Sequence, residues 1–72
     1  MKYEYKIRED VITDEEGELH TVFGIEAWCG KELVRTISDV FYQQKNAEHY
    51  IELFNKLNLS IIHLEDVIED IL

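Results

Sequence analysis

Histidine and cysteine are the side chains of this sequence best suited to metal binding or nucleophilic chemistry, and they are few. The chain has three histidines, His20, His49 and His63, and one cysteine, Cys29. A structural zinc site needs closely spaced ligands such as Cys-x-x-Cys or His-x₃-His, and neither spacing occurs. We therefore expect the histidines to be surface or capping residues, at a strand start, on a wet helix face and at a helix start.

The acidic turn at residues 14–18 and the single cysteine are two further places where chemistry could occur. The acidic turn DEEGE, residues 14–18, could hold a hard cation weakly, but it lacks the ligand pattern of a calcium loop. Cys29 beside Gly30 would be reactive if exposed, yet no histidine is placed near it to act as a base. Lysine and arginine are too scattered to cradle a phosphate. The sequence thus predicts no enzyme, no catalytic residue, no metal and no cofactor.

The charge balance restricts the classes of partner. Sixteen acidic residues oppose seven basic ones, for a net charge of −9 over 72 residues. This charge argues against nucleic acid and against anionic membrane surfaces. No apolar run is long enough to span a bilayer, and the first residues contain no apolar signal-peptide core. We expect a cytoplasmic protein.

The first half of the sequence predicts a β-hairpin. Residues 3–13 alternate between apolar and charged side chains, and a second alternating run follows the DEEGE turn. Pairing Thr13 with Leu19 keeps the apolar side chains on one face and sets Lys6 opposite Glu26 on the other face. A shift by one residue would break up the apolar face, so this register is predicted.

The turn at Gly30-Lys31 determines how the third strand pairs. Glycine in the first position fits a two-residue type II′ turn, which sets Trp28 opposite Leu33 and Glu26 opposite Arg35. Lys6, Glu26 and Arg35 would then cross the outer face in a line. A three-residue loop would instead turn Leu33 and Ile37 inward but would pair Ile25 with Arg35, so the two-residue loop is preferred.

Gly24 interrupts the second strand. Such a glycine marks either a bulge or bend, or a point at which another backbone or a ligand approaches closely. Nothing nearby resembles a glycine-rich phosphate loop, so a bulge or bend is the favoured interpretation.

The preferred register leaves apolar side chains on the sheet face that the helices do not cover. These candidate interface residues are Val22, Trp28, Leu33 and Ile37. An exposed apolar patch in so short a chain suggests a homodimer or protein-partner interface centred on Trp28. The alternatives are that Trp28 only caps the end of the sheet, or that the third strand pairs the other way.

The second half of the sequence predicts two helices. Apolar residues recur every three or four positions, as on a helix with one buried face, at Ala47, Tyr50, Ile51, Phe54 and Leu57. Asn46 is the expected N-cap, and Asn58 tolerates the left-handed conformation that ends a helix. Ser60 is expected to cap the next helix, with the helix itself starting near His63.

Three segments resemble a known family. TVFGIEAW, RTISDV and LNLSIIHLEDVIEDIL together are similar to a family of small uncharacterised bacterial proteins, a domain of unknown function. Its members carry Gly-Ile in a middle strand and close on a His-Leu-x-Asp-Val-Ile-Glu-Asp-like helix. The resemblance implies a compact intracellular domain with a strand-strand-strand-helix-helix pattern, and it transfers no site residues.

We therefore predict a single α+β domain over residues 1–72. It consists of a three-stranded antiparallel β-meander followed by two helices packed on one face, with strands at about 2–13, 19–28 and 32–41 and helices at about 46–58 and 61–71. The predicted function is a non-catalytic interaction or regulatory module that self-associates through the outer sheet face. The alternatives are an acidic decoy of a nucleic-acid-binding protein, and a small-ligand-binding domain with a pocket near Tyr3, Tyr5 and Tyr50.

Overall fold

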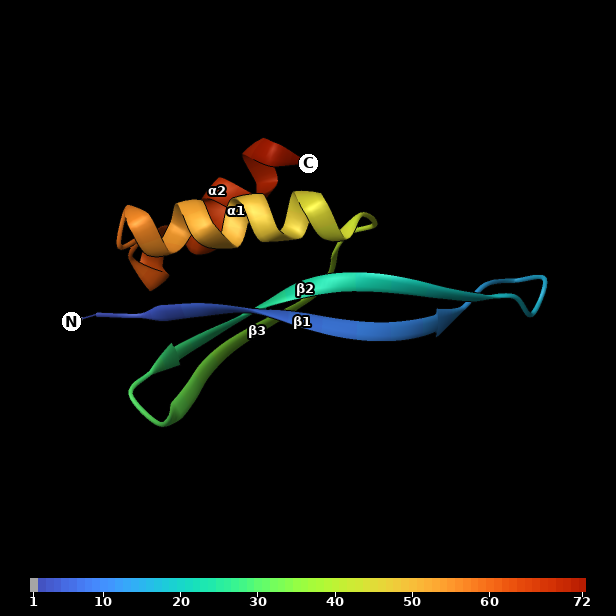
Figure 1. Cartoon of the computed structure of the whole chain (residues 1–72), viewed down its shortest axis with the longest axis horizontal. Helices are drawn as coiled ribbons and strands as arrows, with labels where there is room; N and C mark the ends of the chain where they lie inside the picture. The colour runs from blue at the N-terminus through green and yellow to red at the C-terminus, as the bar shows by residue number, and fades with distance from the viewer. Residues whose placement is uncertain (1) are drawn as a thin grey trace.

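The computed structural model describes residues 2–72 and contains three strands followed by two helices (Figure 1). The elements are β1 (Glu4–Thr13), β2 (Leu19–Cys29), β3 (Glu32–Phe41), α1 (Gln44–Lys56), the short 3₁₀ helix η1 (Ile61–His63) and α2 (Leu64–Ile71). The sheet is antiparallel in the order β1-β2-β3, and both helices lie on one face. The α+β fold class predicted from the sequence is confirmed.

The first hairpin has the predicted register. Thr13 lies opposite Leu19, and Lys6 lies opposite Glu26. Tyr5 and Ile7 of β1 therefore share the helix-covered face with Phe23, Ile25 and Ala27 of β2. Alternation alone was enough to fix this register, because a shift by one residue would have moved every apolar side chain to the other face.

The second hairpin follows the prediction only near its turn. Trp28 lies opposite Leu33 as expected, but the pairing then shifts by one residue, so that Arg35 lies opposite Ala27. Val34 is the extra residue of this irregularity. The predicted pairing of Glu26 with Arg35, and the line of charges built on it, are therefore wrong.

The shift moves Arg35 to the helix side of the sheet. There its guanidinium forms an ion pair with Glu65 of α2. On the outer face Glu26 is instead 3.6 Å from a guanidinium nitrogen of Arg8.

At Gly24 the backbone of β3 comes very close to β2, and the pairing of the two strands is irregular at the same place. A Cβ atom at this position would lie 2.3 Å from the carbonyl oxygen of Ile37 and 3.0 Å from the Cα atom of Ser38. The pairing between β2 and β3 shifts again here, between Ile25 and Phe23. The strand that approaches belongs to the same chain, and only glycine gives it room.

The core lies between the inner sheet face and the two helices. Ile25, Ala27 and Ala47 are fully buried within it. The cluster that surrounds them comprises Tyr5, Phe23, Val40, Phe41, Ile51, Phe54, Leu64 and Ile68. Among the residues that the structure describes, no polar or charged residue is buried.

The end of α1 fastens onto β1. Asn58 adopts a left-handed conformation (φ 50°), as predicted, and Leu59 N–H donates to the carbonyl of Phe54 over 3.0 Å, which closes a Schellman motif. The Asn55 amide then bonds both backbone groups of Tyr5, accepting from its N–H over 2.7 Å and donating to its carbonyl over 3.0 Å. The Tyr5 hydroxyl donates to the Leu59 carbonyl over 2.5 Å.

The helix starts differ in how far they follow the prediction. α1 begins at Gln44, and its N-cap Gln43 makes no side-chain capping bond, so the assignment of Asn46 as the cap is wrong. Gln43, which has an extended backbone, is the last residue of the connection from β3, so α1 starts two residues before the predicted start at residue 46. Ser60 does cap η1, its hydroxyl accepting from Ile62 N–H over 3.4 Å.

Candidate functional site

Trp28 lies on the outer face of the sheet, held by polar neighbours. Its indole N–H donates to a Glu26 carboxylate oxygen over 3.0 Å. The Lys6 ammonium lies 5.1 Å from the ring centroid, within the range of a cation–π contact. The ring is half-buried, and its orientation is fixed by these two contacts.

Leu33 extends the apolar surface beside the indole. It lies directly opposite Trp28 on β3 and is 42% exposed. We call these two residues the tryptophan patch. The charged side chains on the same face of β1 and β2 are Glu4, Lys6, Arg8, Asp10 and Glu26.

The other two candidate interface residues are not exposed on this face. Ile37 lies opposite Ile25 and packs against the core, because the bulge at Val34 shifts the register. Val22 is 1% exposed, which we attribute to the passage of β3 across β2 at Gly24, two residues further along the same face. Placing Val22 and Ile37 on an open surface was wrong, whereas an interface at Trp28 and Leu33 stays a prediction.

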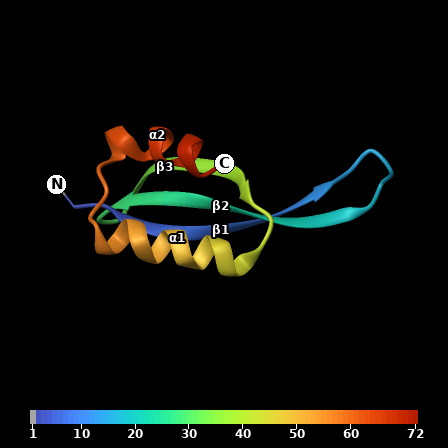
Figure 2. The same ribbon diagram turned by 90° about the horizontal axis from the view of Figure 1, so that it is seen from above.

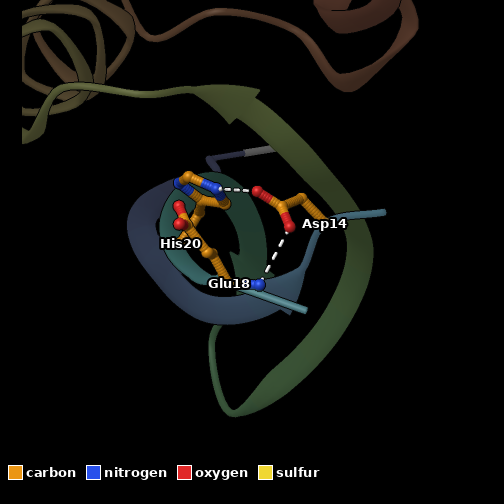
Figure 3. A group of neighbouring side chains, drawn as sticks. All are labelled: Asp14, Glu18 and His20. Atoms are coloured by element: carbon orange, nitrogen blue, oxygen red, sulfur yellow. Dashed lines mark hydrogen bonds and ion pairs between the residues drawn. The ribbon is translucent and has the colours of Figure 1, made fainter. Parts of the chain in front are cut away.

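The tip of the first hairpin holds a cluster of donor atoms (Figure 3). One Asp14 carboxylate oxygen lies 2.7 Å from Nε2 of His20, and the other accepts the backbone N–H groups of Glu16 and Glu18 over 2.9 Å each. Ligand-type atoms of Asp14, Glu18 and His20 all lie within 4.8 Å of one another. Carboxylate and imidazole donors at this spacing could contact one metal ion.

Hydrogen bonding explains this cluster without an ion. The bond from His20, assisted by the backbone N–H of Glu18, lowers the pKa of the Asp14 carboxyl below its ordinary value. The charged carboxylate of Asp14 therefore already has hydrogen-bond partners within the turn. All three side chains of the cluster are also exposed to water. We therefore assign Asp14 to the organisation of the turn.

Sequence reasoning missed this cluster, although the signal was present. The sequence pattern places residues 14–18 in an acidic turn and His20 at a strand start, and it predicts no contact between them. The predicted register sets Ile12 opposite His20, so extending it past the strand ends places Asp14 opposite Glu18 and brings His20 to the same tip.

The remaining candidate residues stay apart. Cys29 is half-buried and has a free thiol. His49 contacts the ring of Tyr50 edge-on, with 5.1 Å between centroids, and His63 ends η1. Within residues 2–72, none of these three joins a group of metal-type ligands.

An open depression lies beside the tyrosines that were considered for a small ligand. It is lined by Lys2, Tyr3, Glu4, Tyr5, Gly30 and Asn55. The side chain of Tyr5 is 2% exposed, its ring meets Phe54 edge-on, and its hydroxyl is already bonded to Leu59. Tyr50 lies elsewhere, stacked on Phe41 with 5.4 Å between the ring centroids.

Comparison with known proteins gives one match. The family of unknown function DUF6514 matches residues 1–72. The chain belongs to this family. No curated protein and no solved structure matches it. Membership of DUF6514 confirms the predicted resemblance to a family of unknown function, with three strands followed by two helices. No helix in residues 2–72 combines the length and the apolar character needed to cross a bilayer.

Proposed function

We propose that this protein is a non-catalytic interaction module that self-associates through the outer face of its sheet. The observation that carries the proposal is the tryptophan patch, which the helices do not cover. The Trp28 ring contacts Glu26 and Lys6, and Leu33 is 42% exposed beside it. Tryptophan is over-represented at the energetic centres of interfaces, where a pre-positioned ring binds with a smaller loss of entropy.

The charges around the patch favour a second copy of this chain as the partner. Lys6 and Arg8 lie on this face together with Glu4, Asp10 and Glu26. The face is therefore nearly balanced in charge, whereas the whole chain carries −9. In a two-fold dimer the same surface meets itself, so a face with both signs can match its bases to the partner's acids.

The area required is within reach of so small a protein. A standard interface removes about 800 Å² from each partner. The described chain exposes 5363 Å², so about one-seventh of it would be covered. A short chain without a disulfide also gains stability from association, because its own core is small.

Sedimentation velocity and light scattering on the wild type, Trp28→Ala and Leu33→Ser test the proposal. We expect the wild type to dimerise in the micromolar range and each variant to dimerise at least about tenfold more weakly, equivalent to about 1.4 kcal/mol. Tyr42→Ser is the matched control, because Tyr42 is 75% exposed on the connection between β3 and α1. Far-UV circular dichroism reports whether each variant is folded.

Two results would contradict self-association through this face. One is a wild-type chain that stays strictly monomeric at high micromolar concentration. The other is a dimer that Trp28→Ala and Leu33→Ser, both folded, leave as tight as before.

A further inference from the structure

The first hairpin projects beyond the rest of the molecule. Its outer part, residues 10–22, extends past β3 and both helices (Figures 1 and 2), and we call it the hairpin arm. The chain measures 44 × 25 × 19 Å, with a radius of gyration of 12.8 Å. A compact domain of this length would have a radius of gyration of about 11 Å, so the arm makes the molecule elongated.

The arm exposes apolar side chains that the core does not use. Val11 is 62% exposed and Leu19 is 72% exposed, and both continue the inner face of the sheet beyond the helices. Ile12, on the opposite face, is 39% exposed. Large apolar residues gathered on a projecting ribbon are typical of a contact surface.

The arm also offers free backbone hydrogen-bonding groups. β3 pairs with β2 from Phe23 onwards and Val22 is 1% exposed, so in the described chain the part of the β2 edge without a neighbouring strand is Leu19–Thr21. An extended segment of another protein can add to such an edge through main-chain hydrogen bonds. A strand added here would continue the line of β3 and complete a three-stranded sheet along the arm.

The hydrogen bonds of Asp14 keep the tip of the arm ordered. They tie the carboxylate to two backbone N–H groups and to His20 across the turn. A ribbon already fixed in its bound shape loses less entropy on binding than a flexible loop.

The charge of the arm decides what kind of partner fits it. Residues 9–30 contain no lysine or arginine. The arm carries the carboxylates of Asp10, Asp14, Glu15, Glu16 and Glu18, of which Asp10 is paired with Arg8. Two arms of the same protein would repel each other, and anionic surfaces are excluded for the same reason.

We infer that the hairpin arm docks a basic protein partner, whose extended lysine- or arginine-rich segment adds as a strand to the edge of β2 at Leu19–Thr21. The main-chain bonds hold the partner strand, Val11 and Leu19 contact its apolar side chains, and the carboxylates of the turn meet its basic ones. This site is separate from the tryptophan patch and does not depend on self-association.

The test is an amide chemical-shift titration of the full chain with a short peptide of alternating lysine and valine. We expect shifts concentrated in residues 10–22, slower hydrogen exchange at Leu19–Thr21, and an affinity that falls at least about fivefold from low to physiological salt. A peptide of alternating glutamate and valine, and an all-lysine peptide, are the controls. Both should bind at least about tenfold more weakly, the first for its charge and the second because it has no apolar side chains.

Two variants distinguish specific binding at the arm from non-specific attraction between opposite charges. The double variant Val11→Ser/Leu19→Ser keeps every carboxylate and should weaken binding about tenfold. Leu57→Ser removes a leucine of similar exposure (65%) at the C-cap of α1, and the end of this helix lies away from the arm (Figure 2), so it should leave binding unchanged.

Three results would overturn the inference. These are binding of the lysine–valine peptide that the arm variant leaves intact, shifts that map to other elements, and equal binding of the all-lysine peptide. Association of two chains that the arm variant abolishes and Trp28→Ala leaves unchanged would show a second copy as the occupant, and would also overturn it.

Discussion

At the scale of single residues, a hydrogen atom in place of a side chain at Gly24 lets β3 lie against β2. The carbonyl oxygen of Ile37 occupies the position that a Cβ atom would take, at 2.3 Å. The contact is with backbone, which cannot move aside as the end of a flexible side chain can. The glycine is therefore required by packing, although its place in the sequence only indicated an irregular strand.

We predict that Gly24→Ala lowers the free energy of unfolding by about 2–3 kcal/mol, because β3 must shift to admit one methyl group. Urea denaturation followed by circular dichroism measures the loss. Gly17→Ala is the control: it has a positive φ of 82° but open space around it, so backbone strain alone should cost about 1 kcal/mol. Equal losses for the two variants would refute the steric explanation.

Tyr5 makes stability depend on pH at the alkaline end. Burial, with a smaller effect of Tyr3, raises the pKa of its phenol above the ordinary value of 10.0. The folded state then holds this proton more tightly than the unfolded state. Stability from this group is complete below about pH 10 and is lost as the pH rises toward the folded-state pKa.

We predict that Tyr5→Phe flattens the decline in unfolding free energy above about pH 10, because it removes the group that titrates. At neutral pH it should cost about 1 kcal/mol for the lost hydrogen bond to Leu59. Urea midpoints measured across the alkaline range give both quantities. A Tyr5→Phe curve parallel to the wild type would contradict the assignment.

At the scale of elements, the two hairpins show what alternation can and cannot predict. The register of β1 with β2 followed from the sequence, because a shift by one residue would have moved the core residues of one strand to the other face. The register of β2 with β3 failed after Trp28, because Val34 is an additional residue whose side chain resembles its neighbours. Where a bulge inserts into an apolar run such as Leu33-Val34, alternation gives no warning of it.

The residues of the candidate site could be predicted only where the pairing of β2 with β3 was predicted correctly. Trp28 and Leu33 are set by the turn and were placed correctly opposite each other, whereas Ile37 lies beyond the bulge and faces the core. The bond of Asn55 to Tyr5 joins residues 50 positions apart, and no local pattern indicates it. Long-range polar contacts of this kind depend on how the helix docks, which the sequence does not display.

α2 carries charges that oppose its own dipole at one end. Glu65 and Asp66 in the first turn suit the positive end, but its last turn contains no basic residue. We predict that Asp70→Lys raises the free energy of unfolding by about 0.3–1 kcal/mol, because it places a cation near the exposed carbonyl groups. Asp66→Lys, the matched change at the other end, should lower it by a similar amount. Thermal unfolding at low ionic strength measures both, and the same sign for the two variants would argue against the dipole effect.

At the scale of the whole molecule, the two proposed surfaces differ in charge and lie on different parts of the fold. The tryptophan patch has both signs of charge around it, and the hairpin arm has only acids beyond Arg8. A net charge of −9, taken alone, indicated only an acidic protein. The distribution of the charges is more informative than their sum. The face around Trp28 can match its charges to those of a second copy, whereas the acidic arm repels a second arm.

The arm should be dispensable for folding. None of the residues from Val11 to Thr21 belongs to the core cluster. We predict that replacing residues 11–21 by Asn-Gly, which joins Asp10 to Val22 through a two-residue turn, changes the unfolding free energy by less than about 1 kcal/mol. Thermal unfolding followed by circular dichroism provides the measurement. A shortened chain that unfolds without a cooperative transition would show that the arm supports the fold.

The fastening of β1 by the end of α1 has a consequence for biosynthesis. Tyr5 emerges from the ribosome long before Asn55 and Leu59, the residues that bond it. β1 therefore lacks these bonds, and the ring of Tyr5 stays open to water, until residues 55–59 have left the ribosome. The fold is thus expected to form in one step once residues 55–59 are available, with no stable fragment forming on the way.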